Sequence, residues 1–109
     1  MPHFQIEYSA NIEDLVDISA LCDAIRAAAA KVQTFPLAGI RVRAVRVEHF
    51  AIADGNPKHG FIDLSIRLRE GRPDDVKLDA ITVIFAALKE FTAEAVSYTH
   101  LTLPTSFEV

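Results

Sequence analysis

Pro2 follows the initiator in the opening stretch Met1-Pro2-His3-Phe4, and it is a residue type that could do acid–base chemistry. Methionine aminopeptidases remove an initiator that precedes a small residue such as proline. Removal would leave Pro2 with a free secondary amine on a ring that locks one backbone torsion. Burial or nearby cations lower the pKa of an amine, so a neutral Pro2 could act as a general base near pH 7. The alternative is that Pro2 is only a convenient second residue.

Arg41 and Arg43 are the next candidates, because they could bind an anion together. They alternate with Ile40, Val42 and Ala44, so both guanidinium groups are expected on the same face of a strand. Two cations on one face repel each other unless a carboxylate or another oxyanion lies close by. The sequence therefore predicts a carboxylate site here, and the alternative is a solvated strand face.

Arg72 is a third candidate for binding an anion. It lies in Gly71-Arg72-Pro73, where Pro73 suits the first position of a helix. Free backbone amides at a helix entrance attract anions, and an adjacent arginine would strengthen that attraction. The alternative is that Arg72 pairs with Asp74 or Asp75.

The elements that must position these residues follow from hydrophobic periodicity. Residues 3–8 and 59–68 alternate polar and apolar side chains, which indicates strands. Residues 40–50 also alternate, but the phase changes at Ala44-Val45, which would suit a β-bulge or a strand that passes between two burial environments.

Two helices are predicted between and after these strands. Asp17 is a plausible N-cap for the first helix, and Pro73 would begin the second. The first helix has the apolar stripe Ile18, Leu21, Cys22, Ile25, Ala28, Ala29 and Val32, and the second has Ile81, Ile84, Phe85, Leu88 and Phe91. Cys22 is expected to be a buried structural residue rather than a nucleophile.

The order of these elements predicts an α+β fold. Strand, turn and long amphipathic helix occur twice, which indicates a duplicated βαβ unit whose sheet has two helices packed on one face. The other sheet face and the strand edges would be left without a partner. A homo-oligomer is therefore expected.

Composition limits the classes of function. The chain has 109 residues, a formal net charge of −4 and one cysteine, Cys22. These values predict a single domain without nucleic acid as a partner, in a reducing, cytoplasmic compartment. Residues 1–15 lack a basic start followed by an apolar run, so we expect no signal peptide, and the apolar tracts are too short for us to expect a membrane partner.

Several stretches together carry a resemblance to a known family. Met1-Pro2-His3-Phe4, residues 35–43 (Phe-Pro-Leu-Ala-Gly-Ile-Arg-Val-Arg), Ala53-Asp54-Gly55 and Gly71-Arg72 resemble 5-carboxymethyl-2-hydroxymuconate isomerase, of the tautomerase superfamily. The resemblance covers residues 1–95, and the stretch 35–41 is its most specific part. We therefore expect a tautomerase-like domain over residues 1–95.

The resemblance implies an isomerase of homoprotocatechuate catabolism. Such an enzyme converts a 2-hydroxymuconate to its unsaturated 2-oxo isomer, as a trimer and without a metal or organic cofactor. By this resemblance Pro2 matches the catalytic proline, and Arg41 and Arg72 match the arginines that hold the small carboxylate substrate. Arg43 is a further candidate for substrate binding, while His3 and His49 are interpreted as structural. Pro73 departs from the Ser or Thr N-cap that is common in the superfamily, which puts the placement of Arg72 in doubt.

Residues 96–109 depart from the family pattern. Val96 to Thr105 resembles the translation of a transposon-based sequencing adaptor, so we interpret 96–109 as a non-native tail. The rival interpretation is that Ser106-Phe107-Glu108-Val109 is the family's own last strand.

A second class of function remains open at this point. The chain could be a non-catalytic oligomeric binding module that keeps the tautomerase fold without its chemistry. Retention of Met1 would favour that alternative, because Pro2 would then have no free amine.

Overall fold

The structure is a computed structural model that describes residues 2–33, 35–68, 74–98, 100–102 and 105–108. Its elements in chain order are strand β1 His3–Ser9, 3-10 helix η1 Ala10–Asp14, helix α1 Ile18–Ala30, 3-10 helix η2 Leu37–Gly39, strands β2 Arg41–Val47 and β3 His59–Arg67, helix α2 Asp74–Tyr98, and strands β4 His100–Thr102 and β5 Thr105–Glu108. The bounds predicted for the first three strands and the first helix agree with these to within a few residues.

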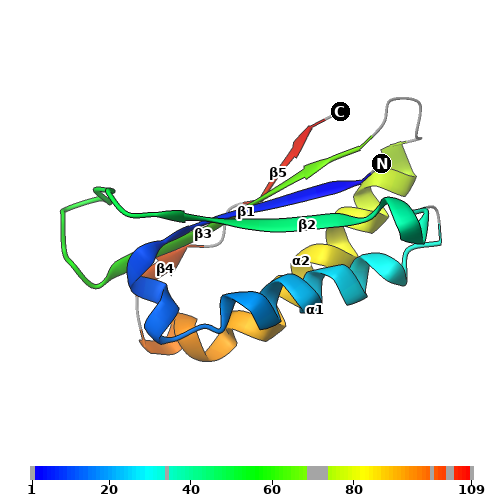
Figure 1. Ribbon diagram of the computed structural model, residues 1–109. Coiled ribbons are helices and arrows are strands. Elements are labelled where there is room, and N and C mark those ends of the chain that lie inside the picture. The colour runs from blue at the N-terminus through cyan, green and yellow to red at the C-terminus, as the bar shows by residue number, and fades with distance from the viewer. Residues whose placement is uncertain (1, 34, 69–73, 99, 103–104, 109) are drawn as a thin grey trace.

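The sheet confirms the duplicated βαβ architecture. Its strand order is β2-β1-β3-β4, and β5 also pairs with β3. β1 is parallel to β2 and antiparallel to β3, while β4 and β5 are parallel to β3. The units β1-α1-β2 and β3-α2-β4 therefore lie side by side with opposite directions. Figure 1 shows both helices on the same side of the sheet, as the sequence predicts.

The core lies between the sheet and the two helices. The even-numbered residues of β1 and β3 point into it because side chains alternate along a strand. The largest fully buried apolar side chains are Phe4, Ile6, Ile12, Leu21, Ile25, Ile62, Leu64, Ile66, Ile84 and Leu88. The odd-numbered residues of the same strands are left on the face that no helix covers, which we call the open sheet face.

Helix α1 begins and packs as its sequence predicts. The Asp17 side chain accepts a hydrogen bond from the amide of Ala20 at 3.1 Å, which caps the first turn. Leu21, Ile25 and Ala29 are fully buried, and Cys22 is half-buried at the edge of the same stripe. Burial raises the pKa of the Cys22 thiol, which agrees with a structural rather than a nucleophilic cysteine.

The buried stripe of helix α2 differs at one residue from the apolar stripe that the sequence predicts. Its buried stripe is centred on Ala80, Ile84, Leu88 and Thr92, which follow one another at intervals of four residues. Phe91, which the sequence places in the apolar stripe, lies at the margin of the buried stripe and is 37% exposed. The hydroxyl of Thr92 is accommodated because it donates to the Leu88 carbonyl at 2.7 Å.

The pairing of strand β2 decides between the two interpretations of the phase change at Ala44-Val45. Each of its residues pairs with one residue of β1, from His3↔Arg41 to Ser9↔Val47, so the predicted β-bulge was wrong. The strand instead passes between two burial environments, which was the other interpretation. Val45 is exposed on the open sheet face, and Arg46 on the covered side pairs with Glu13 of η1 at 3.0 Å.

Two predictions concern the second half of the chain. The turn Gly71-Arg72-Pro73 lies outside the described residues, as does the choice between Arg72 as an anion site and as a partner of Asp74 or Asp75. The main chain of 100–102 and 105–108 pairs with β3, and the non-native origin of 96–109 stays a prediction. None of the helices in the described part of the chain is long and apolar enough to cross a membrane.

Candidate active site

Pro2 lies at the end of the sheet where β2 begins and β3 ends. Its side chain is fully buried, and its carbonyl accepts a hydrogen bond from the Arg41 amide at 3.1 Å. The next residue, His3, pairs with Arg41 on one side and Arg67 on the other. Pro2 is therefore held by main-chain bonding between two strands, which is a rigid position for a reacting group.

The turn before β2 fixes the start of that strand beside Pro2. Phe35 is buried and contacts Phe4 of β1 edge-on, with ring centroids 5.9 Å apart. Pro36 then leads into η2, which the Gly39 amide closes by donating to the Pro36 carbonyl at 2.9 Å. The stretch that carries the most specific resemblance therefore anchors Arg41 next to Pro2.

The Arg41 guanidinium turns back over this turn. Its Nη1 donates to the carbonyls of Ala38 at 2.8 Å and Ile40 at 3.0 Å. The side chain is exposed, and both bonds use a single nitrogen of the fork. Its other donors meet no acceptor in the part of the chain that the structure describes, so they are available to a carboxylate at this end of the sheet.

Arg43 takes a different direction, across the open sheet face. Its Nη2 donates to the Gln5 side-chain oxygen at 3.2 Å, and its Nη1 lies 3.4 Å from His3 Nδ1. The Gln5 amide in turn donates to Glu7 at 3.2 Å. Strand alternation puts Arg41 and Arg43 on one face, as predicted, but their guanidinium groups have different partners.

Arg72 cannot be placed relative to these groups, because it lies outside the described residues. The roles predicted for Pro2, Arg41, Arg43 and Arg72 all stay predictions. The structure brings the Arg41 backbone to Pro2 and brings Arg43 to His3. His49 is exposed between β2 and β3.

Sequence reasoning missed the polar residues that accompany Arg43. A cavity of about 180 Å³ on the open sheet face is lined by His3, Gln5, Glu7, Arg43, Ser65 and Arg67. All six are odd-numbered strand residues, so strand alternation was the signal that could have grouped them. Their grouping also needed the register of β1 against β2 and β3, which only the structure supplies.

An Asp–His pair at the opposite end of the sheet was also missed. Asp54 Oδ1 lies 2.7 Å from His59 Nε2. The amide of Asn56 and then the His59 ring hold the pKa of the Asp54 carboxyl below its usual range. These bonds close the loop before β3 and lie far from Pro2, because β3 begins where β1 ends.

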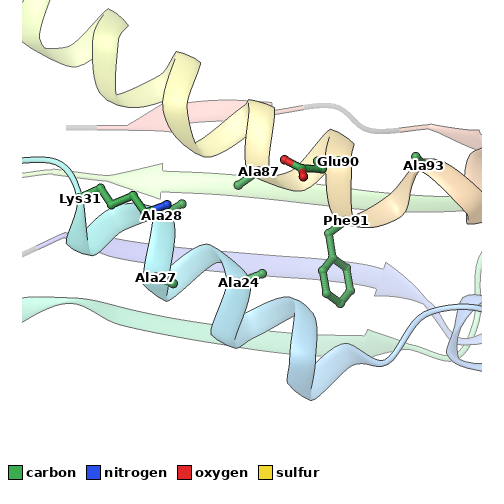
Figure 2. A pocket seen from close by; sticks show the side chains of 8 residues that line it. All are labelled: Ala24, Ala27, Ala28, Lys31, Ala87, Glu90, Phe91 and Ala93. Atoms are coloured by element: carbon green, nitrogen blue, oxygen red, sulfur yellow. The ribbon is translucent and has the colours of Figure 1, made fainter.

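Figure 2 shows a larger cavity, of about 580 Å³, between α1 and α2. Its walls are mainly alanines, with Lys31, Glu90 and Phe91 at its margins. It lies on the helical side of the molecule and contains none of the residues that the sequence indicated for chemistry.

Comparisons with known proteins agree with this arrangement. The family model described as 5-carboxymethyl-2-hydroxymuconate isomerase matches residues 2–109. A 5-carboxymethyl-2-hydroxymuconate Delta-isomerase from Escherichia coli is 31% identical over 109 residues, which span all of this chain and 85% of the relative.

Solved structures give the same result. A crystal structure of a 5-carboxymethyl-2-hydroxymuconate delta-isomerase matches with a TM-score of 0.95 and 31% identity, over 100% of this chain and 82% of the other. A fused 4-OT, solved as a symmetric trimer, matches with a TM-score of 0.70 at 15% identity, over 98% of this chain and 85% of the other. That second likeness concerns the fold alone.

Proposed function

The chain belongs to the 5-carboxymethyl-2-hydroxymuconate isomerase family, and on this premise we propose that it isomerises 5-carboxymethyl-2-hydroxymuconate to the unsaturated 2-oxo isomer. The observation that carries the proposal is the position of Pro2. The family match begins at this residue, and the structure buries its side chain just before β1 begins, with its carbonyl bonded to the Arg41 amide. The Pro2 ring is therefore held in a fixed position, which suits a residue whose amine is to act on a substrate.

The proposed mechanism uses Pro2 as a general base after removal of Met1. The neutral amine accepts the proton of the 2-hydroxyl group as the 2-oxo group forms. The electron pair moves along the conjugated diene, and the protonated Pro2 returns a proton to carbon. One O–H bond of the substrate is thus broken and one C–H bond is formed in the same molecule, so the reaction needs no oxidant or reductant.

Arginines supply the charge for this reaction in our proposal. Arg41 lies at the Pro2 end of the sheet with unused donors among the described residues, which supports its role in holding a substrate carboxylate. By family resemblance Arg72 acts with Arg41, and the two arginines hold the substrate carboxylate and the 2-oxo group. Cations at this end of the sheet would also favour the neutral form of Pro2.

We also propose that the chain works as a homotrimer in the cytoplasm. The strand edge of β2 supports assembly, since β2 is the last strand of the sheet on its side and unpaired strand edges tend to find partners. The fused 4-OT of the same fold is a symmetric trimer. A single cysteine fits a reducing compartment.

The first prediction concerns Pro2→Ala. The variant keeps a small second residue, so Met1 is still removed, but the terminal amine becomes primary and loses the proline ring. We expect kcat/KM to fall by about 10²–10⁴-fold, which is the usual contribution of a general base. Loss of the ultraviolet absorbance of the dienol measures turnover, and intact mass verifies the terminus of each protein.

The matched control is Pro57→Ala, which changes an exposed loop proline and should leave turnover as it is. Unchanged turnover in Pro2→Ala would remove the role of the proline. A wild-type mass that includes Met1 would favour the non-catalytic binding module instead.

A further inference from the structure

The open sheet face has an ordered charge pattern that the reaction at Pro2 does not require. Helices cover only one side of the sheet, as Figure 1 shows, so the odd-numbered strand residues are left uncovered on the other. Strand register arranges them in three rows across β2, β1 and β3: Arg41–His3–Arg67, Arg43–Gln5–Ser65 and Val45–Glu7–Asp63. The first row therefore has two arginines and the third has two carboxylates, while β5 sets Glu108 opposite Arg67 at the edge of the first row.

Arg43 belongs to this pattern, and none of its contacts among the described residues is with a carboxylate. Its contacts within the described residues are with neutral acceptors, Gln5 and the His3 ring. Arg26 and Arg46 differ, because they pair with carboxylates at 2.8 Å and 3.0 Å. A guanidinium whose acceptors are all neutral gains an ion pair and a second, parallel hydrogen bond when a carboxylate replaces them.

The surroundings of Arg43 decide what such a ligand can be. Arg43 and Arg67 both line the cavity of about 180 Å³, and His3 at one end of it pairs with Arg67 in the register and lies 3.4 Å from Arg43 Nη1. A water molecule fills about 30 Å³ of liquid, so the cavity has room for a small molecule but not for a nucleotide. Glu7 lines the other end and would repel an anion, which favours binding near His3.

We propose that Arg43, with His3, Gln5 and Arg67, forms a binding site for the carboxylate group of a small organic acid on the open sheet face. Gln5 is the positioning residue of the site: its oxygen orients the Arg43 fork, and its nitrogen holds Glu7 back. The site goes beyond the proposed reaction, because it requires neither a free Pro2 amine nor turnover.

Titration of the full-length chain with succinate, followed by 15N NMR, tests this site. We expect saturable shifts at millimolar succinate in the amides of His3 and Gln5 and in the Arg43 Nε signal. Succinamide, which has the same size but no charge, should cause none. Arg43→Gln should weaken succinate binding by about tenfold, the cost of one charged hydrogen-bond partner, and Arg43→Lys should bind with intermediate strength.

Arg46→Gln is the matched control, because it removes the same charge from the same strand at a position already neutralised by Glu13. Succinate binding should be unchanged in this variant. Equal weakening in Arg43→Gln and Arg46→Gln would overturn the proposal, since it would show only a general charge effect. Absence of shifts at His3 and Gln5 in the wild-type chain would overturn it as well.

The carboxylate could come from the substrate at Pro2 or from a separate acid, and an activity measurement distinguishes these sources. Competitive inhibition of dienol turnover by succinate, lost in Arg43→Gln, would assign the site to the substrate. Succinate binding without competition would assign it to a separate acid. The NMR titration does not depend on turnover. A chain that binds succinate without isomerising the dienol would contradict the proposed reaction alone, and a chain that isomerises the dienol without binding succinate at Arg43 would contradict the proposed site alone.

Discussion

Glu7 and Asp63 oppose each other directly across β1 and β3, so two carboxylates share one cross-strand position. Like charges in this arrangement destabilise a sheet. Burial, and then the charge of Glu7, raises the pKa of the Asp63 carboxyl. The folded chain therefore favours the protonated form of Asp63 more than the unfolded chain does.

This difference gives a pH dependence with a definite sign. The stabilising contribution of the protonated carboxyl is complete below the unfolded pKa of about 4 and is lost as the pH rises through the raised folded value. We predict that Asp63→Asn increases the free energy of unfolding at pH 7, by less than about 1 kcal/mol for a partly exposed pair. Urea unfolding at several pH values measures this, and the gain should disappear below about pH 4.

Asp14→Asn serves as the control, because Asp14 is exposed and the change in net charge is identical. An equal gain in this variant would attribute the effect to the net charge of −4 rather than to the Glu7–Asp63 pair. In a chain that already carries Asp63→Asn, Glu7→Gln should increase the free energy of unfolding little further, because the repulsion between the two carboxylates is already absent.

At the scale of elements, the N-terminus of α1 depends on one side chain. Asp17 accepts the Ala20 amide, and no acidic residue follows it in the first turn of the helix. We predict that Asp17→Ala lowers the free energy of unfolding by about 1 kcal/mol, because an amide of the first turn loses its acceptor. The midpoint of urea unfolding measures the change.

Asp23→Ala is the comparison within the same helix. It removes an acid whose ion pair with Arg26 is exposed, and exposed pairs contribute little. Asp23→Ala should lower the free energy of unfolding by at most a few tenths of a kcal/mol. If both variants lost the same stability, the capping role of Asp17 would be contradicted.

Elements set by local pattern were predictable from the sequence, whereas those set by distant contacts were not. The stripe of α1 and its Asp17 cap lie within one segment, and both are confirmed. The phase change in β2 left a bulge and a change of burial environment both open, because the apolar positions shift from even to odd numbers at Val45. The strand has no bulge, and Arg46 lies on its covered side. Glu13, from η1, neutralises Arg46 there, and that partner is 33 residues away.

The candidate site, too, could be predicted from the sequence only where it depends on residue type and local pattern. Pro2 and Arg41 could be named from residue type and resemblance, but their main-chain contact comes from the parallel pairing of β1 with β2. Gln5, Ser65 and Arg67 were not selected, because none is unusual in its own segment. They become a group only when the register places them beside Arg43.

At the scale of the whole molecule, the last residues complete the edge of the sheet. β4 pairs with residues 59–61 of β3, and β5 pairs with residues 64–67. This pairing does not decide the origin of 96–109, because main-chain hydrogen bonds can be made by almost any extended segment. We propose that the tail is non-native and that β3 uses it as a sequence-tolerant partner.

Two variants of residues 104–109 test this proposal by hydrogen exchange. Deletion should expose the amides and carbonyls of β3 at 64–67, lowering the opening free energy of the amides bonded to β5 by about 1 kcal/mol each. It should also promote edge-to-edge association, which light scattering after size exclusion detects. Replacement by a strand-forming sequence of equal length and charge should restore both properties, because only the main chain is needed. If the replacement were as damaging as the deletion, β3 would require the side chains of Thr105–Glu108, and this segment would be the family's own last strand.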